Sequence, residues 1–389
     1  MRLTVDEVLA ATGGRLLAGD ARQEIDSVTI DSRCVEAGGM FVALAGTRDG
    51  HDFVEDAIRR GARAVLVDRR VEVADATVAI EVGDTRDALS SLARSARARL
   101  GSAQVIGVTG STGKTSTKDL AAGALRRRRV HVSSRSFNNE LGVPLTLLAT
   151  PDDTEVVVVE MGARAIGDIA YLCDLARPDV GVVTNTGLAH VGELGSAENV
   201  ARAKGELIEA LPASGTAVLD AGDASTPSLR ARSRARVLSF GVDSPGADVC
   251  ARRVSLDEGL CARFLLDTPW GSAEVELRVP GRHQVSNAAA AAAATGAAGV
   301  ALDHIVEGLA AARLSGGRLS IKRAAGGAVV LDDTYNANPT SMLAALEALA
   351  AHPSQGERWA VLGEMAELGP HAADQHRLAG AHVVRLGIQ

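Results

Sequence analysis

One segment after the first hundred residues constrains the fold more than any other. An apolar run over 104–108 leads into the loop Thr-Gly-Ser-Thr-Gly-Lys-Thr at 109–115, and a helix-like stretch follows over 116–125. This order predicts a strand, a glycine loop and a helix, in which backbone N–H groups and the helix start surround a polyphosphate. Lys114 can then reach the outer phosphates and Thr115 can hold Mg²⁺. The sequence therefore predicts the use of ATP or GTP.

The strict form of this loop has a glycine five residues before Gly113, where this chain has Val108. The alternative is a tight strand-to-helix turn with a solvated lysine. Because the strand signal before the loop and the helix signal after it agree, the phosphate-binding interpretation is favoured.

Length and composition limit the remaining possibilities. A chain of 389 residues predicts two or three domains. Aromatic residues make up only 2%, so the core must be built from Ala, Val, Leu and Ile. A net charge of −7 argues against a nucleic-acid partner. The arginine run at 126–129 falls where the helix after the loop should end, and cations there suit the helix dipole.

The N-terminus and the cysteines indicate the compartment. The four cysteines are scattered, without the close spacing of a zinc or redox motif, which favours reduced thiols. The first residues contain early acids and no long apolar core, unlike a signal peptide. No apolar run approaches the roughly 20 residues that a membrane span needs. We therefore expect a cytoplasmic protein without a membrane span, and we expect a monomer.

The alternation of elements predicts an α/β chain of three domains. Residues 1–100 form a small α/β unit, and residues 101–314 form a central domain. In the central domain, continuous apolar strands separated by helices predict a parallel sheet covered on both faces. An antiparallel patch over 249–279 and a helix over 284–298 follow. Residues 315–389 begin a third, Rossmann-like domain, for which only three strands are predicted, at 320–323, 328–332 and 359–362. Because a doubly wound sheet has more strands, this domain is predicted to be incomplete.

Three side chains could extend the phosphate site. Glu160 ends an apolar strand, at the sheet edge where ligands of parallel sheets bind, and Mg²⁺ prefers such oxygen ligands. His190 follows the next strand, although a lone histidine is more often structural. Lys204 lies in a predicted helix, where its own surroundings indicate only an exposed lysine. Two further segments, 138–144 and 332–339, are rich in groups that either bind ligands or cap turns.

Together these motifs resemble the Mur ligases, the ATP-dependent amide-forming enzymes of peptidoglycan assembly. The loop at 109–115 is similar to that family's variant phosphate loop, including the missing first glycine. The segments 31–33 and 46–53 are similar to its uridine-nucleotide domain. The later motifs are similar to those of the member that completes the peptide: Glu160-Met161-Gly162-Ala163, Asn185 with Ala189-His190, Ala203-Lys204-Gly205-Glu206, Asp332 through Pro339, and Leu362-Gly363-Glu364-Met365.

The resemblance implies a reaction and a set of roles. The chain would join D-alanyl-D-alanine to UDP-N-acetylmuramoyl-tripeptide through an acyl phosphate, with ATP, two Mg²⁺ ions and a carbamate derived from CO₂ on Lys204. Lys114, Lys204 and His190 would be catalytic, and Thr115, Glu160, His190 and carbamylated Lys204 would bind metal. ATP would contact Thr109, Gly110, Ser111, Thr112, Gly113, Lys114, Thr115, Asn138, Asn287, Arg318 and Asp333. The substrates would contact Asp31, Ser32, Arg33, Gly46, Asp49, His51, Asn336 and Asn338.

Several alternatives stay open at this stage. The diamino-acid-adding Mur ligase and the folylpolyglutamate synthetases share the same loop logic, but the segments 332–339 and 31–53, respectively, argue against them. A nucleotide-dependent switch would need no further metal ligands beyond the loop. Diaminopimelate and lysine both remain possible as the third residue of the peptide. Gln284 also departs from the family, in which an Asn after the His is more usual.

Overall fold

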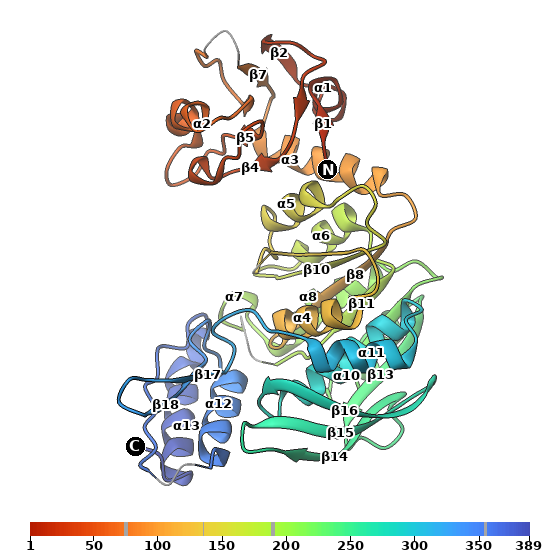
Figure 1. The fold of residues 1–389 in the computed structure, drawn as a ribbon, viewed down its shortest axis with the longest axis vertical. Helices are drawn as coiled ribbons and strands as arrows, with labels where there is room; N and C mark the ends of the chain where they lie inside the picture. The colour runs from red at the N-terminus through yellow and green to blue at the C-terminus, as the bar shows by residue number, and fades with distance from the viewer. Residues whose placement is uncertain (74–76, 135, 188–190, 354–355) are drawn as a thin grey trace. The chain divides into compact units, whose positions relative to one another are not determined.

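The structure is a computed structural model that describes residues 1–73, 77–134, 136–187, 191–353 and 356–389 (Figure 1). Its internal contacts divide the chain into two compact units. The first unit consists of residues 1–103 and 137–154, and the second consists of residues 104–136 and 155–389. The segment 137–154 thus packs with the N-terminal residues, although it lies inside the predicted central domain. The three domain boundaries given above stay a prediction.

The first unit is built on a five-stranded sheet of order β2-β7-β6-β5-β4. Strands β4 to β7 run parallel and β2 joins β7 antiparallel. The Val, Ala, Leu and Ile side chains of the middle strands are buried between the covering helices. The elements are β1 (Leu3–Thr4), α1 (Val5–Thr12), β2 (Arg15–Ala18), β3 (Glu24–Ile25), β4 (Val28–Thr29), η1 (Ser32–Cys34), β5 (Met40–Val42), η2 (Gly50–Phe53), α2 (Val54–Arg59), β6 (Ala64–Val67), β7 (Val78–Glu81), α3 (Thr85–Arg99) and α5 (Gly142–Ala149).

Helix α5 joins the first unit because of its apolar side chains. Leu148 is buried in the same cluster as Leu89 and Leu92 of α3, and Leu145 packs against that cluster. The sequence predicted only a loop over 138–144, but the helix already begins at Gly142. The turn before it is formed by Asn139, whose side-chain oxygen accepts a hydrogen bond from the backbone N–H of Gly142 at 2.9 Å.

The second unit contains a nine-stranded sheet of order β16-β15-β14-β13-β12-β11-β8-β10-β9. The strands from β9 to β14 are parallel, and β14, β15 and β16 pair antiparallel, which confirms the predicted parallel sheet and antiparallel patch. The elements are β8 (Gln104–Thr109), α4 (Lys114–Ala124), β9 (Val130–Val132), β10 (Val156–Glu160), α6 (Asp168–Ala176), β11 (Val180–Val183), α7 (Val191–Leu194), α8 (Ala197–Glu209), β12 (Thr216–Asp220), α9 (Thr226–Arg232), β13 (Arg236–Val242), β14 (Val249–Leu256), β15 (Cys261–Thr268), β16 (Gly271–Pro280), α10 (Gln284–Ala297) and α11 (Leu302–Ala311).

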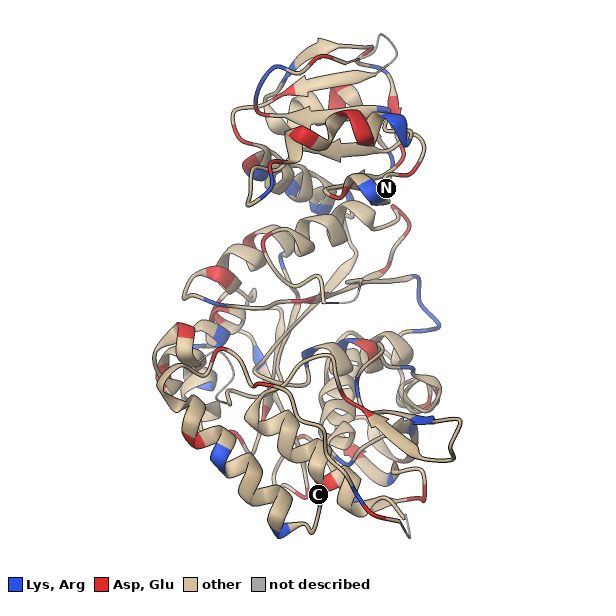
Figure 2. Cartoon of the chain, turned by 90° about the vertical axis from the view of Figure 1, so that its left-hand side faces the viewer, with Lys and Arg blue, Asp and Glu red and all other residues tan. Residues whose placement is uncertain are grey.

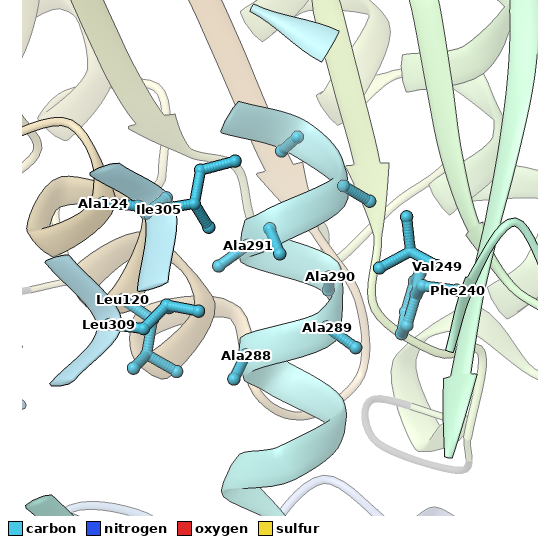
Figure 3. Packing of buried hydrophobic residues seen from close by; sticks show 14 of the residues in the cluster. Leu120, Ala124, Phe240, Val249, Ala288, Ala289, Ala290, Ala291, Ile305 and Leu309 are labelled. Atoms are coloured by element: carbon cyan, nitrogen blue, oxygen red, sulfur yellow. The ribbon is translucent and has the colours of Figure 1, made fainter. Parts of the chain in front are cut away.

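The alanine run of α10 explains how a chain so poor in aromatic residues builds this core. Residues 288–294 are all fully buried. Figure 3 shows the helix between the sheet residues Phe240 and Val249 on one side and side chains of α4 and α11 on the other. Because alanine has a small side chain and a high helix propensity, it lets three layers approach closely without breaking the helix.

The last part of the second unit contains a two-stranded antiparallel sheet, β17 (Ser320–Arg323) with β18 (Val329–Asp332), followed by α12 (Pro339–Ala351), η3 (Gly369–His371) and α13 (Ala372–Arg385). The strand predicted at 359–362 is wrong: this segment has no strand assignment, and the Trp359 and Val361 residues are 65% and 99% exposed. Its apolar composition suits a strand, but no described strand pairs with it. Instead, the backbone N–H of Ala360 donates to the Gln389 carbonyl at 2.8 Å.

Candidate functional site

The glycine loop connects β8 to α4 at the carboxyl edge of the parallel sheet. Strand β8 lies between β10 and β11, so the loop stands where the strand order reverses, the usual ligand position in such sheets. Gly110 has a φ of 147° and Gly113 a φ of 81°, and a side chain at either position would overlap Thr184 or Asn287, respectively. Only glycine combines this backbone conformation with so close an approach.

Thr184 and Asn185, which directly follow β11, stabilise the conformation of the loop. The Asn185 side-chain oxygen accepts from the Thr112 backbone N–H at 3.1 Å, and its amide nitrogen donates to the Thr112 carbonyl at 3.1 Å. The Thr184 hydroxyl donates to the same carbonyl at 2.5 Å. In the sequence, Asn185 was interpreted only as part of a family motif. Its position directly after an apolar strand was the signal that could have identified it as a loop-positioning residue.

Lys114 is the first residue of α4, and its ammonium group folds back over the loop. Its Nζ donates to the Gly110 carbonyl at 2.7 Å and lies 3.4 Å from the Ser111 carbonyl. Burial lowers the pKa of Lys114, while the nearby Glu160 carboxylate opposes that shift. A cation is therefore held against the loop by carbonyl oxygens that a bound anion would replace.

Thr115 and Glu160 form a pair of oxygen ligands next to this lysine. The Thr115 hydroxyl donates to Glu160 Oε2 at 2.8 Å, and Glu160, at the end of β10, is 1% exposed. The Arg318 guanidinium reaches the same hydroxyl, with Nη2 donating to Thr115 Oγ1 at 2.8 Å. A buried hydroxyl and a buried carboxylate at this distance have the hard-oxygen chemistry that suits Mg²⁺.

Arg318 has donor capacity left over. Its guanidinium carbon lies 4.2 Å from the centre of the Tyr335 ring. Its Nε is buried, and no hydrogen-bond partner for it occurs among the described residues. An unsatisfied buried donor is costly, and a phosphate or carboxylate oxygen would satisfy it.

Lys204 lies on α8 and is 1% exposed, which the sequence did not predict. Burial, together with the positive charge of Lys114, lowers the pKa of Lys204 to about 7. Two residues further along α8, the Glu206 carboxylate accepts from the backbone N–H groups of Gly167 at 2.6 Å and Ala170 at 3.0 Å. Glu206 thus caps the start of α6 and attaches α8 to the segment that follows Glu160. His190 lies outside the described residues.

A cavity of about 420 Å³ opens beside the loop. Gly113, Asn287, Arg318 and Asp333 all line it, so the structure brings three of the predicted nucleotide residues together with the loop. Asp333 also accepts a hydrogen bond from the backbone N–H of Leu319 at 2.9 Å. The fourth predicted nucleotide residue outside the loop, Asn138, belongs to the first unit.

The two asparagines predicted to meet a substrate differ in their surroundings. Asn336 lines a second cavity of about 950 Å³ between β18, α12 and the segment 359–364. The Asn338 side chain instead caps α12, accepting from the Ser341 backbone N–H at 3.0 Å. The sequence contained the signal for this cap, because Asn338 directly precedes a Pro and stands three residues before a Ser.

The candidate residues of the first unit are bonded mainly to one another. Asp31 accepts from Arg33 Nη2 at 2.7 Å, which contributes to lowering the pKa of Asp31 to about 2. Ser32 donates to Asp56 at 3.1 Å. His51 is buried, its Nδ1 lies 2.7 Å from Asp49, and its Nε2 lies 3.2 Å from the Asp68 backbone nitrogen. Gly46 lies in the segment between β5 and η2, near these side chains in sequence.

Other features bear on ligands outside this site. Acidic and basic residues are interspersed along the ribbon (Figure 2), and the arginine run at 126–129 is paired with acids such as Glu307 and Glu155. Within the described ranges, no group of three or more His, Cys, Asp or Glu side chains is arranged to hold a metal ion. No helix in that part of the chain is long and apolar enough to cross a membrane.

Comparisons with known proteins identify similar sequences and folds. The Mur ligase middle domain matches residues 108–295, the Mur ligase glutamate ligase domain matches residues 317–386, and the Mur ligase family catalytic domain matches residues 24–97. The chain is 42% identical to the UDP-N-acetylmuramoyl-tripeptide–D-alanyl-D-alanine ligase of Mycobacterium tuberculosis, over 100% of this chain and 82% of that protein.

Two solved structures are similar along nearly the whole chain. MurF from Acinetobacter baumannii superimposes with a TM-score of 0.91 at 35% identity, covering 100% of this chain and 84% of that one. MurF ligase from Thermotoga maritima, solved in complex with ADP, has a TM-score of 0.78 at 33% identity and covers 92% of this chain and 82% of that one.

Proposed function

Because this chain belongs to the Mur ligase family, we propose that it is an ATP-dependent ligase that joins D-alanyl-D-alanine to UDP-N-acetylmuramoyl-tripeptide. The product is the UDP-muramoyl-pentapeptide, formed together with ADP and phosphate. The observation that carries the proposal is the convergence of Lys114, Thr115 and Glu160 at the end of β8 and β10 in a chain of this family. This reaction is the last cytoplasmic step of peptidoglycan precursor synthesis.

The loop residues would bind the triphosphate and stabilise its developing charge. Backbone N–H groups of residues 109–115 would surround the β- and γ-phosphates, and the Lys114 ammonium would leave the Gly110 carbonyl to reach them. The buried Nε of Arg318 has no hydrogen-bond partner among the described residues, and it would donate to a phosphate oxygen. Such groups act by positioning and electrostatics rather than by covalent chemistry.

The metal ligands fit Mg²⁺ by their chemistry. Thr115 and Glu160 offer a hydroxyl and a carboxylate oxygen 2.8 Å apart, and we propose His190 and carbamylated Lys204 as the further ligands. When bound, Mg²⁺ neutralises charge on the phosphates during transfer.

Lys204 suits carbamylation because its amine is easily freed of its proton. With a pKa of about 7, a large share of the side chain is neutral near neutral pH, and only the neutral amine adds to CO₂. The nitrogen bonds to the carbon of CO₂ and loses a proton, which converts a cation into an anionic oxygen ligand. This change also removes the repulsion between Lys204 and Lys114.

The substrate carboxylate then attacks the γ-phosphorus, forming an acyl phosphate and ADP. The free amine of D-alanyl-D-alanine attacks the activated carbonyl, and phosphate leaves. Water would hydrolyse the acyl phosphate, so the site has to exclude it. We propose that Asp31, Arg33 and His51 and their neighbours bind the uridine nucleotide, and that Asn336 and Asn338 lie near the dipeptide.

The test is phosphate release by the full chain with each substrate left out in turn. Release that requires ATP, UDP-N-acetylmuramoyl-tripeptide and D-alanyl-D-alanine together supports the proposal. Release that is indifferent to the dipeptide would indicate a nucleotide-dependent switch. Release that needs a diamino acid and the shorter UDP-muramoyl-dipeptide would indicate the related ligase instead.

A further inference from the structure

A row of hydrogen-bonded side chains leads from His283, just before α10, to Thr117 in α4, the helix that follows the phosphate loop. His283 Nε2 lies 2.9 Å from Gln284 Nε2, and Asn287 Nδ2 donates to Gln284 Oε1 at 2.9 Å. At the far end, the Thr117 hydroxyl donates to Asn287 Oδ1 over a longer 3.5 Å. Gln284 and Asn287 lie on α10 and Thr117 lies on α4, and all three residues are buried.

The direction of each bond in the row depends on its neighbour. An amide nitrogen only donates and an amide oxygen only accepts, so the Gln284 nitrogen requires His283 Nε2 to be an acceptor. The neutral ring then carries its proton on Nδ1. If the Gln284 amide were reversed, its nitrogen would face the Asn287 nitrogen, and Asn287 would have to reverse as well. The tautomer of His283 and the orientation of both amides are therefore linked.

The neutral His283 ring has one donor and one acceptor nitrogen, so its Nε2 can either accept from the Gln284 amide or donate to it. Burial lowers the pKa of His283 to about 4, so the imidazole is neutral near neutral pH and one of its nitrogens is an acceptor. Gln284 is 1% exposed, so an unmatched donor or acceptor on its amide could not be satisfied by bulk water.

The Asn287 amide is the member of the row that meets the loop. Its Oδ1 lies so close to Gly113 that a side chain on that glycine would overlap it. Gly113, His283, Gln284 and Asn287 also line the same cavity of about 420 Å³. Through Gln284, the tautomer of His283 thus decides whether Asn287 presents a donor or an acceptor beside the N-terminus of α4.

We propose that Gln284 is a positioning residue, which couples the tautomer of His283 to the amide orientation of Asn287 in the nucleotide cavity. The inference rests on the proposed function only in that the cavity receives ATP. Gln284 acts through Asn287, and the row itself exists without ligand.

The first measurement is ¹⁵N NMR of the histidine side chains in the unliganded full chain. The His283 signals are assigned by their loss in His283→Gln. We expect Nε2 to resonate as an unprotonated nitrogen and Nδ1 as a protonated one. In Gln284→Glu, a carboxylate offers only acceptor oxygens, so we expect the ring proton to move to Nε2. A protonated Nε2 in the unchanged protein would overturn the proposal.

The second measurement is the kinetics of Gln284→Met, which keeps the chain length and removes both hydrogen bonds. Because Asn287 is then free to turn, we expect the KM for ATP to rise about 5-fold while kcat stays within about 2-fold. Thr117→Val breaks only the last bond, so we expect a smaller rise in KM and an unchanged His283 tautomer. An unchanged KM in a folded Gln284→Met would overturn the proposal.

The two measurements separate the possible failures. If the unchanged protein does not bind ATP, the proposed function fails, whereas the NMR result on the unliganded chain still decides whether the row has the stated direction. If Gln284→Met does not fold, the tautomer in the unchanged protein and in Gln284→Glu carries the test.

Discussion

The two units hold their candidate site residues in different ways. In the second unit, the phosphate loop is held by buried contacts from distant parts of the chain, with Asn185 and Thr184 bonded to Thr112. In the first unit, Asp31 and Asp49 bond to residues two positions away, namely Arg33 and His51, and Asp49 has one further partner, Arg69. Both carboxylates also cap short 3-10 helices.

This difference separates two kinds of sequence motif. Where a backbone must adopt positive φ and approach a neighbour closely, only glycine fits, so the spacing of Gly110 and Gly113 predicts a geometry. Where an Asp caps a turn, the same residues would be present with or without a ligand. We therefore expect substitutions in the loop to abolish turnover and those in the first unit to change substrate binding or stability.

The largest effect is expected for Lys114→Ala. The variant removes the cation that lies 2.7 Å from the Gly110 carbonyl, so charge on the transferred phosphoryl group loses its nearest partner. We expect kcat to fall by about 10³-fold, measured as phosphate release with all three substrates.

Arg127→Ala is the matched control, because it removes a positive charge just beyond the other end of α4, where Arg127 pairs with Glu307 at 2.6 Å. It should keep nearly full turnover. Near-normal activity of Lys114→Ala would contradict the phosphate-loop assignment. The loop of the second unit would then be a structural turn, like the capped turns of the first unit.

The next effect is expected for Lys204→Ala, with a loss of about 10²-fold in kcat that short carboxylic acids partly restore. The added acid would replace the carboxylate group of the carbamate. Arg202→Ala, an exposed neighbour on α8, is the control. Full activity of Lys204→Ala, or a loss that no acid restores, would contradict the carbamate role.

The pH dependence of the unchanged protein tests the same group. Because burial and the charge of Lys114 lower the pKa of Lys204 to about 7, the neutral amine predominates above that pH and the ammonium form below it. We expect added bicarbonate to raise activity more below pH 7 than above it. An effect of equal size on both sides would show that protonation of this lysine does not limit carbamylation.

The sequence predicted the central part of the fold well, because the continuous valine strands and the alanine helix can only be buried in a covered parallel sheet. It failed where pairing depends on distant residues. The segment 359–362 has the composition of a strand but no strand partner among the described residues, and strand β13, at residues 236–242, was not predicted at all. The packing of α5 onto the first unit could not be predicted either, since Leu148 finds its partners about 60 residues earlier.

The candidate site shows the same limit. Thr115 and Glu160 were each predicted as Mg²⁺ ligands, Thr115 from the loop motif and Glu160 from its place at a strand end, and the structure has the two side chains in contact. The burial of Lys204 was missed, because a lysine in a helix was interpreted as exposed. Val200, Leu207 and Ile208 lie four residues before and three and four residues after it, which is the helical spacing of a buried face. The role of Lys204 was nevertheless supplied by the resemblance to a family alone.

A smaller effect is expected for Arg33→Ala in the first unit. The exposed guanidinium is held by Asp31 at 2.7 Å, and we propose that it contacts the UDP substrate. Losing one charge-assisted hydrogen bond should raise the KM for the UDP substrate by about 10-fold and leave the KM for ATP unchanged. Arg22→Ala, a highly exposed arginine of the same unit, is the control. If only stability changes, Asp31 and Arg33 form a structural turn.

The smallest effect on catalysis is expected for Glu206→Gln. This variant tests whether Glu206, in the second unit, is a structural helix cap like Asp31 and Asp49 in the first unit. Glu206 lies two residues from Lys204, yet both of its oxygens accept from backbone N–H groups at the start of α6. We expect the free energy of unfolding to fall by about 1–2 kcal/mol, measured by denaturant unfolding, with kcat within about 2-fold. Glu209→Gln, which loses only the exposed pair with Arg232, should cost less than about 1 kcal/mol. A large loss of kcat at unchanged stability would mean that the carboxylate acts on Lys204 rather than on α6. Glu206 would then be a positioning residue for Lys204 and not a structural cap.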